Sequence, residues 1–454
     1  MRDSSPVRWG LLLTLGITVF MFGQSPSRTL AQTRVNEPDT SEVDTATAEQ
    51  RSRAERWRKK RRAKSEDLSP PTPSFGDRIR RFIAETGGSL VPHRRILNVP
   101  ELEVAGIHPV FGGLGGEAGL AGGLRYESPF LRSKRHFATA EALASLRRYY
   151  TFESVAGFDW GRYVAYGYAR YQHQPREKFY GIGPEPGSME GSLYRIDQAL
   201  SGGLFARSLS DRVLLGGQAA YQTNRLGDGG GSGPQIRTQF GSLPGVNADT
   251  DYLMMGTFFE FDSRDASYDR AFARRFAPTE QRLRRVSLEA RRGFYVAAEV
   301  THNVNTRADN FDFTRFTLDI REFLPVGHEL MHGFAFRQFA SVTQSPDGQV
   351  PFYRLQSIGG ARSLRGYDAG QFRDRNVLLT NVEARCQVWH WLDMALFGDV
   401  GQVFRDIEDA RLGDPHIGYG LGFRIKRDGQ TLGRLDVVNS EKGITTHIDL
   451  GSLF

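Results

Sequence analysis

The chain has 454 residues, of which 39% are hydrophobic, and a formal net charge of +7 at pH 7. A mean hydropathy of −0.43 excludes a helical membrane protein, and a single cysteine, Cys386, excludes an intrachain disulfide and a cysteine-based metal site. We interpret Cys386 as a buried or lipid-facing thiol. The high content of Gly (51), Phe (31) and Tyr (16) at such modest hydropathy fits a membrane β-barrel, whose strands alternate apolar and polar residues.

Residues 1–31 have the pattern of a secretory signal peptide that is cleaved near Ala31. Arg2 and Arg8 precede the apolar run at 9–23. This run is shorter than the roughly 20 residues that a spanning helix needs. An uncleaved membrane anchor is the alternative interpretation.

Residues 32–106 have the composition of a basic, proline-containing linker, which we place in the periplasm. Residues 51–64 hold nine Lys or Arg and one Glu, so the rest of the chain carries 7 − 8, or about −1. A basic tract can bind nucleic acid, but behind an export signal we exclude nucleic acid as a partner. We interpret 51–64 as a solvated arm. Contact with an anionic lipid or with a periplasmic partner is the alternative.

Within this linker, residues 75–86 are predicted to form a short amphipathic helix. Phe75, Ile79, Phe82 and Ile83 recur at helical spacing, Ser74 can cap the first turn, and the glycines at 87 and 88 end it. We expect this helix to pack on the body of the protein rather than on a membrane surface.

From residue 107 to residue 454, the sequence alternates with a period of two, which predicts strands with two unlike faces. At roughly 22 residues per strand and connection, this length predicts about 16 strands. Short connections at 209–211 and 324–327 contrast with a long one at 227–251, as in outer-membrane barrels. The predicted fold class is all-β, a transmembrane antiparallel β-barrel with a short polar and helical N-terminal extension. The alternation is clearest near the C-terminus, where Tyr419, Leu421, Phe423 and Ile425 oppose Gly418, Gly420, Gly422 and Arg424, and where Ile444, Thr446, Ile448, Leu450 and Phe454 oppose Thr445, His447 and Asp449.

The stretch HELMH at 328–332 matches the H-E-x-x-H pattern of zinc proteases, which works only on a helix. Pro325 and the glycines at 327 and 333 flank it, and the alternating stretch GFAFRQFA follows. These neighbours predict a turn that leads into a strand. On a strand, His328 and His332 are about 13 Å apart, too far to share one zinc ion at about 2.0 Å from each nitrogen. We therefore interpret both histidines as polar residues at a strand end.

The other motifs do not indicate a catalytic or cofactor-binding site either. GLGGEAG at 113–119 only approximates a dinucleotide-binding pattern and does not open a helix, so we read it as glycines in a crowded first strand. A barrel-embedded hydrolase is a further alternative, but no spacing selects a set of serine and histidine residues. We expect no catalytic residue, no metal and no cofactor, and predict that the chain is not an enzyme.

Three segments resemble the BamA/TamA superfamily of outer-membrane barrels, the bacterial surface antigen group. Residues 358–376 read IGGARSLRGYDAGQFRDRN, residues 381–389 read NVEARCQVW, and residues 397–404 read FGDVGQVF. The family hallmarks are GG-x-x-SLRGY on an inward-folded loop and F-x-D-x-G-x-x-F on a nearby strand. FYGIG at 179–183, DSRD at 262–265 and the terminal Phe454, taken as the C-terminal strand signal, add weaker support.

The resemblance implies a latch inside the barrel, in which the loop arginine, Arg365, pairs with Asp399 and Glu383. Strand alternation agrees, because Asp399 shares its face with Phe397 and Gly401. A guanidinium fork can bind two carboxylates at once. The resemblance assigns Gly366 to a tight turn and Tyr367 to a wedge against the wall. The remaining residues that the motifs single out as scaffold are Gly359, Gly360, Ser363, Leu364 and Phe404.

By resemblance, the function is protein insertion or secretion through a gated barrel with a lumenal RGY loop. Its partners are outer-membrane lipid and unfolded outer-membrane or secreted proteins. Translocating family members carry soluble POTRA domains before the barrel, whereas residues 32–106 are too linker-like to form one. The alternative is therefore a POTRA-less pore or structural barrel without client proteins.

Overall fold

The computed structural model describes residues 107–114, 118–127, 136–185, 190–264, 290–326, 331–410, 415–427 and 430–450. The predicted signal peptide, the linker with its amphipathic helix and basic arm, and Phe454 lie outside these residues.

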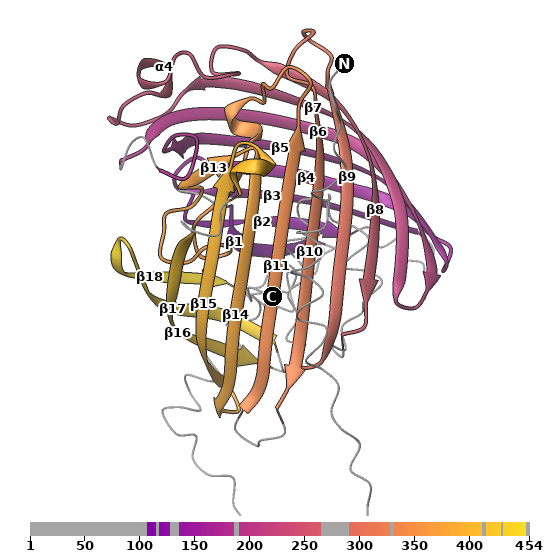
Figure 1. The fold of residues 1–454 in the computed structure, drawn as a ribbon. Helices are drawn as coiled ribbons and strands as arrows, with labels where there is room; N and C mark the ends of the chain where they lie inside the picture. The colour runs from indigo at the N-terminus through magenta and orange to yellow at the C-terminus, as the bar shows by residue number, and fades with distance from the viewer. Residues whose placement is uncertain are drawn as a thin grey trace, which may run out of the picture. The chain divides into compact units, whose positions relative to one another are not determined.

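Sixteen strands form one antiparallel sheet, in which each strand pairs with its neighbours in chain order (Figure 1). This confirms the predicted all-β class and the predicted number of strands. Within the described part of the chain, β1 and β18 are the two end strands and no pairing joins them. The strands are β1 (Ile107–Gly113), β2 (Leu120–Glu127), β3 (His136–Ser145), β4 (Tyr150–Asp159), β5 (Tyr163–Phe179), β6 (Ser192–Ser210), β7 (Val213–Asp228), β8 (Thr250–Asp262), β9 (Gly293–Asn305), β10 (Phe313–Pro325), β11 (Met331–Gln344), β14 (Asn376–Trp389), β15 (Leu392–Phe404), β16 (His416–Arg427), β17 (Gln430–Ser440) and β18 (Gly443–Leu450).

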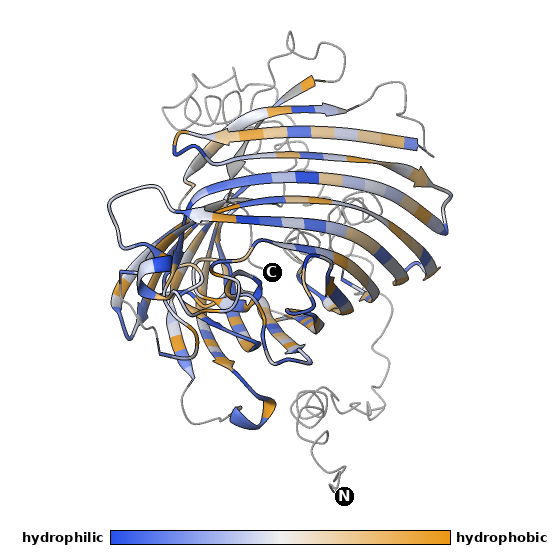
Figure 2. Cartoon of the chain, turned by 90° about the horizontal axis from the view of Figure 1, so that it is seen from above, coloured by the Kyte–Doolittle hydropathy of each residue, from blue (hydrophilic) through white to orange (hydrophobic). Residues whose placement is uncertain are grey.

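The sheet has an apolar outer face and a polar inner face, because side chains alternate along each strand. Figure 2 shows this as apolar and polar bands that alternate along the strands. In β16, Tyr419 and Leu421 are 55% and 41% exposed, whereas Arg424 is buried. The structure therefore has the two faces that the alternation predicted. Cys386 lies in β14, is partly buried, and its thiol contacts the carbonyl of Met394 at 3.5 Å.

Long connections gather at one end of the sheet. They include residues 229–249, which contain the short helix α4 (Ile236–Gln239), and residues 345–375. Most connections at the other end are short, such as 160–162 and 211–212. The end of β8 and the start of β9, which residues 263–292 join, lie at the end of the short turns, so this long connection departs from the predicted pattern; residues 265–289 lie outside the described residues. None of the described helices is long and apolar enough to span a membrane.

The end of the HELMH stretch lies on a strand, as predicted. β11 begins at Met331, and a register irregularity separates Met331 from Gly333, whose φ is +135°. His328 lies outside the described residues. No cluster of three His, Cys, Asp or Glu residues suited to a metal ion occurs in the described ranges.

Residues 352–374 fold back onto the inner face of the sheet. They contain a turn of 3₁₀ helix, η2 (Phe352–Arg354), and a small hairpin of β12 (Gln356–Ile358) and β13 (Phe372–Asp374). A second 3₁₀ turn, η3 (Ile407–Asp409), follows β15. The loop contributes buried apolar side chains to a cluster shared with β14 and β15, which consists of Ile358, Leu364, Tyr367, Phe372, Val377, Leu379 and Val403. This cluster seats the loop against the wall.

Candidate functional site

Residues 359–371, here called the latch loop, connect β12 to β13. Gly359, Gly360 and Gly366 have φ values of +118°, +91° and +95°, which favour glycine. The Ser363 hydroxyl donates to the Gly359 carbonyl at 2.8 Å and accepts the Gly359 N–H at 2.9 Å. The Gly360 N–H donates to the Tyr367 carbonyl at 3.0 Å. These bonds fix the compact shape that places Arg365 at the tip facing the sheet.

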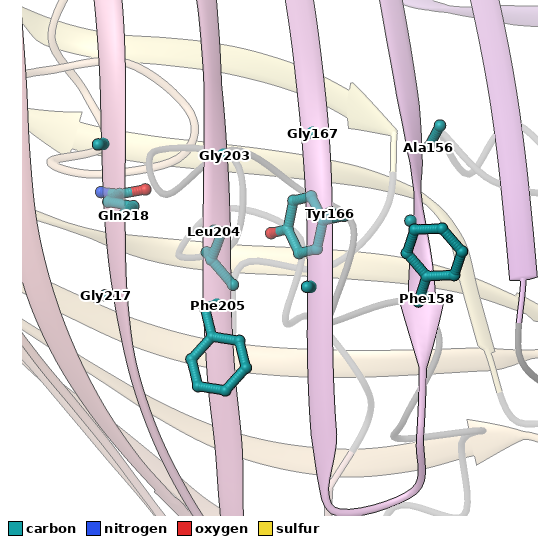
Figure 3. A pocket seen from close by; sticks show the side chains of 12 residues that line it. Ala156, Phe158, Tyr166, Gly167, Gly203, Leu204, Phe205, Gly217 and Gln218 are labelled. Atoms are coloured by element: carbon teal, nitrogen blue, oxygen red, sulfur yellow. The ribbon is translucent and has the colours of Figure 1, made fainter.

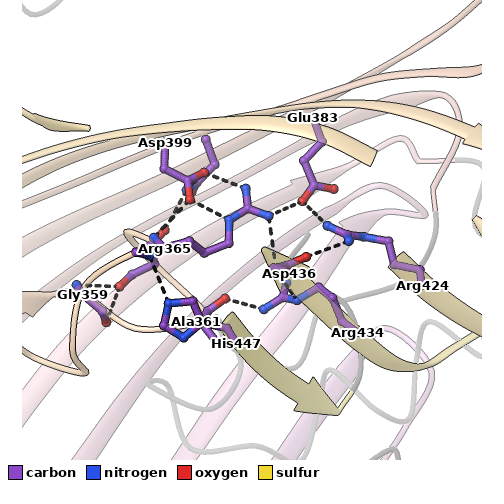
Figure 4. A network of polar contacts seen from close by, with 12 residues as sticks. Gly359, Ala361, Arg365, Glu383, Asp399, Arg424, Arg434, Asp436 and His447 are labelled. Carbon is purple, nitrogen blue, oxygen red and sulfur yellow. Dashed lines mark hydrogen bonds and ion pairs between the residues drawn. The ribbon is translucent and has the colours of Figure 1, made fainter. Parts of the chain in front are cut away.

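Arg365 is fully buried and binds two carboxylates at once (Figure 4). Its Nε and Nη2 donate to the two Asp399 oxygens at 2.6 and 2.7 Å, and its main-chain N–H adds a bond of 3.1 Å. Its Nη1 donates to Glu383 Oε1 at 2.8 Å. The guanidinium carbon lies 3.5 Å from the centre of the Phe397 ring, which gives a cation–π contact. The structure thus brings together the residues that the motifs single out.

The pairing extends to the neighbouring strands. Arg424 of β16 donates to Glu383 at 2.7 Å and to Asp436 of β17 at 2.8 Å. Arg434 contacts Asp436 at 3.0 Å, and Asp436 lies 3.6 Å from Arg365. Arg385 donates to the second oxygen of Glu383 at 3.0 Å. We call this set the latch network, which consists of Arg365, Glu383, Arg385, Asp399, Arg424, Arg434 and Asp436.

Strand register explains why these groups meet. Asp399 of β15 stands opposite Asn381 of β14 on one side and Gly418 of β16 on the other. The Asn381 amide donates to Asp399 at 2.8 Å. Gly418 leaves the space into which the loop backbone enters, since a Cβ there would lie 2.0 Å from the Arg365 carbonyl oxygen. A small residue in this position is therefore what allows the latch loop to reach Asp399.

The other motif residues form the seat of the loop. Leu364 is fully buried, and a Cβ on Gly401 would lie 2.7 Å from Ile358 Cδ1. Tyr367 is buried edge-to-face against Phe372, with ring centres 5.0 Å apart. The Tyr367 hydroxyl donates to the Ile417 carbonyl at 3.1 Å. Phe404, at the end of β15, is buried and stands opposite Asn376 of β14.

Tyr367→Phe is expected to lower the free energy of unfolding by about 0.5–1.5 kcal/mol, the usual net value of one hydrogen bond. The ring and its packing stay, and only the bond to the Ile417 carbonyl is lost. Urea unfolding of the barrel in detergent micelles measures the change. Tyr163→Phe, on the exposed face of β5, is the control and should change stability by less than about 0.5 kcal/mol. Equal effects of the two variants would contradict the assigned role of Tyr367.

A second buried charged group lies on the inner face of β8 to β11. Asp319 accepts from Arg321 at 2.7 Å and from Arg337 at 3.2 Å. Arg264 donates to Asp262 at 2.9 Å. The motif DSRD therefore has a structural role at the end of β8 that its match to the family pattern did not specify.

Sequence reasoning missed Arg424, Arg434 and Asp436. The available signal was the alternation itself, because each lies on the glycine-bearing or polar face of its strand. Charged residues on an inner barrel face need partners, so an Arg-x-Asp pair at 434 and 436 indicates an ion-pair site. Which partner each one takes depends on register, and the sequence does not give register.

The arrangement positions groups rather than carrying out chemistry. Glu383 and Asp399 are each bound to arginine, so neither is a free general base. A separate hollow of about 480 Å³ lies over β4 to β7 and is lined mainly by small and apolar residues such as Gly203 and Phe205 (Figure 3). Its lining lacks the several convergent polar groups that fix a small ligand. Neither feature resembles an active site.

Comparison with known proteins gives one family match. Residues 283–434 match the model of the Omp85 superfamily domain. The match contains the latch loop, Glu383, Asp399 and Arg424, and ends before Asp436. No curated protein matches the chain.

Solved structures resemble this fold at low sequence identity. BamA from Haemophilus ducreyi lacking POTRA domains 1–3 has a TM-score of 0.53 at 12% identity, over 76% of this chain and 69% of that chain. CdiB from Acinetobacter baumannii has a TM-score of 0.47 at 13% identity, over 73% and 56% of the two chains. CdiB from Escherichia coli has a TM-score of 0.47 at 10% identity, over 76% and 62%.

Proposed function

We propose that this chain is an outer-membrane β-barrel of the Omp85 superfamily that inserts or secretes client proteins, with the latch loop controlling the opening of the barrel. Members of the superfamily are transporters and assembly factors rather than enzymes, in agreement with the prediction of no catalytic activity. The clients are unfolded outer-membrane or secreted proteins, and the exposed apolar face contacts outer-membrane lipid. We also propose that residues 1–31 direct export, that 32–106 form a periplasmic linker and that 107–454 form the barrel.

The latch network is the observation that supports this proposal. Removing charges from water costs several kcal/mol per ion, and a buried ion pair often adds little net stability over an apolar contact. Seven charged residues are buried or mostly buried here. Apolar residues would stabilise the sheet as well without the cost of removing these charges from water. Such a network does fix one position of the loop, since the fork of Arg365 fits only one arrangement of its carboxylates.

The latch loop occupies the inner side of β14 to β16, so a client that uses this space requires the loop to move. Arg365 and Tyr367 hold it closed by polar bonds of defined geometry. Such bonds break as a unit, which gives two discrete states rather than a gradual shift. This is the physical basis on which we assign the loop to gating.

Deletion of the gene, followed by comparison of the outer-membrane and surface proteomes, tests the proposed function. Loss of several barrel proteins would indicate insertion, and loss of one surface protein would indicate secretion. The wild-type gene should restore the missing proteins, whereas Arg365→Ala should restore fewer at equal barrel abundance. An unchanged proteome would contradict the proposal and favour the POTRA-less pore or structural barrel, for which single-channel conductance is the direct assay.

A further inference from the structure

We infer that His447 is a positioning residue that ties the latch loop to the end strand β18 and releases it on protonation. This inference deepens the proposed function, because it rests on the loop being the movable part of the barrel. It concerns a residue that lies outside the family match, which ends at residue 434.

His447 reaches the latch loop from the last strand of the sheet. Its Nε2 accepts the main-chain N–H of Gly366 at 3.0 Å (Figure 4). Gly366 directly follows Arg365, so the bond lies beside the centre of the latch network. An imidazole nitrogen accepts a hydrogen bond only when it carries no proton. The observed contact therefore requires His447 to be neutral, with its proton on Nδ1.

Gly366 uses both of its main-chain polar groups to hold the end of the sheet. Its N–H donates to His447 of β18, and its carbonyl accepts from the Ser440 hydroxyl of β17 at 2.9 Å. Lys442, in the turn between these strands, pairs with Asp368 of the loop at 2.5 Å. β18 pairs with β17, and His447 stands opposite Asp436 in that pairing. Arg365 binds carboxylates of β14 and β15, and the adjacent Gly366 binds β17 and β18. Two neighbouring loop residues thus link the latch network to β18.

The charges around His447 are balanced. Asp436 and Arg434 act on it from β17, and Arg365 and Asp368 act on it from the latch loop. Two anions and two cations surround the ring, and its partial burial disfavours the charged form. A proton added at Nε2 removes the acceptor and places an N–H against the N–H of Gly366. It also adds a cation beside Arg365 and Arg434, so the loop and β18 separate.

His416 also contacts the loop, but its bonds do not require a neutral ring. His416 also packs on the loop, with its ring stacked 3.7 Å from that of Phe372. Its Nε2, however, lies 2.8 Å from the Pro184 carbonyl oxygen, to which it donates. A doubly protonated ring still donates this bond, and its Nδ1 then pairs more strongly with Glu441, 3.4 Å away. Protonation of His416 therefore leaves its attachment to the loop intact.

The test is hydrogen–deuterium exchange of the full-length barrel in lipid nanodiscs at pH 7.5 and pH 4.5, corrected for the intrinsic pH dependence of exchange. We expect amides of β18 and of residues 362–368 to exchange at least about five-fold faster at pH 4.5, because the more acid buffer protonates the imidazole. In His447→Gln, whose amide oxygen takes the place of Nε2 and does not titrate, the pH dependence should disappear.

His302→Gln is the matched control, since His302 lies on the exposed face of β9 and contacts Thr314. It should keep the wild-type pH dependence. The inference is overturned if wild-type β18 exchanges equally at both pH values, or if His447→Gln keeps the acceleration. The assay contains no client protein, so its result is independent of the proteome comparison. An unchanged proteome with pH-dependent exchange would contradict the proposed function and leave the role of His447 standing.

Discussion

Arg365→Ala is expected to lower the free energy of unfolding of the barrel by about 3–5 kcal/mol, the cost of breaking a buried ion pair from one side. The variant leaves Asp399 and Glu383 buried, and Asp399 loses all the side-chain bonds that it receives from Arg365. Arg424 still binds Glu383, which keeps the loss below that of two isolated charges. Urea unfolding in detergent micelles measures the change, and the heat needed to unfold the barrel on a gel should fall with it.

Arg365→Lys separates charge from geometry. A lysine keeps the positive charge but cannot form the two parallel bonds to Asp399, so an intermediate loss is expected. In the double variant Arg365→Ala with Asp399→Ala, the loss should be clearly smaller than the sum of the two single losses, because the residues act as a pair. Additive losses, or a wild-type midpoint for Arg365→Ala, would show that the contact does not hold the loop.

Gly418→Ala is expected to release the latch loop at a cost of about 3 kcal/mol or more, at the upper end of overpacking effects. The added Cβ would lie 2.0 Å from the Arg365 carbonyl oxygen and 3.1 Å from its carbonyl carbon. Backbone atoms at these positions cannot rotate away, so the loop must leave its seat and forfeit the bonds of Arg365. Limited proteolysis within residues 359–371 should accelerate strongly, and unfolding should begin at lower urea.

Gly398→Ala is the matched control, since Gly398 lies on the adjacent strand β15 opposite Tyr419, and a Cβ there meets nothing within 4 Å. It makes the same chemical change at an open position. Its stability should stay within about 0.5 kcal/mol of wild type, and the loop should remain protected. Equal proteolysis of both variants would refute the assignment of Gly418 as the opening for the loop.

Much of the fold could be predicted because membrane strands obey a strict rule. Residues with a period of two must show one face to lipid, so Tyr419 and Leu421 could be placed outside and Arg424 inside from the sequence alone. Connection lengths were less informative. β8 ends and β9 begins at the end of the short turns, and the composition of the residues between them gives no sign of this.

The centre of the site was also visible in the sequence, because Arg365, Glu383 and Asp399 lie in motifs with recognisable spacing. Asp436 and His447 were not singled out. Each reaches the latch loop only through the register of β16 to β18, and that register is set by pairing along the whole strand. Sequence patterns predict on which face of the sheet a residue lies. Its position along the strand relative to a loop from another part of the chain depends on strand register, which the assembled sheet sets.

The burial of the latch network determines how the loop should respond to the salt concentration around the protein. Dissolved ions screen charges that lie in water, but they act much less on pairs inside a protein. Arg365 and Asp399 are out of contact with solvent, so the strength of their ion pair should change little with the ionic strength of the surroundings. Limited proteolysis of the loop in about 0.05 M and 1 M NaCl would measure this, and a strong dependence on ionic strength would show that water reaches the pair. The position of the latch loop should therefore be largely independent of the salt concentration around the protein.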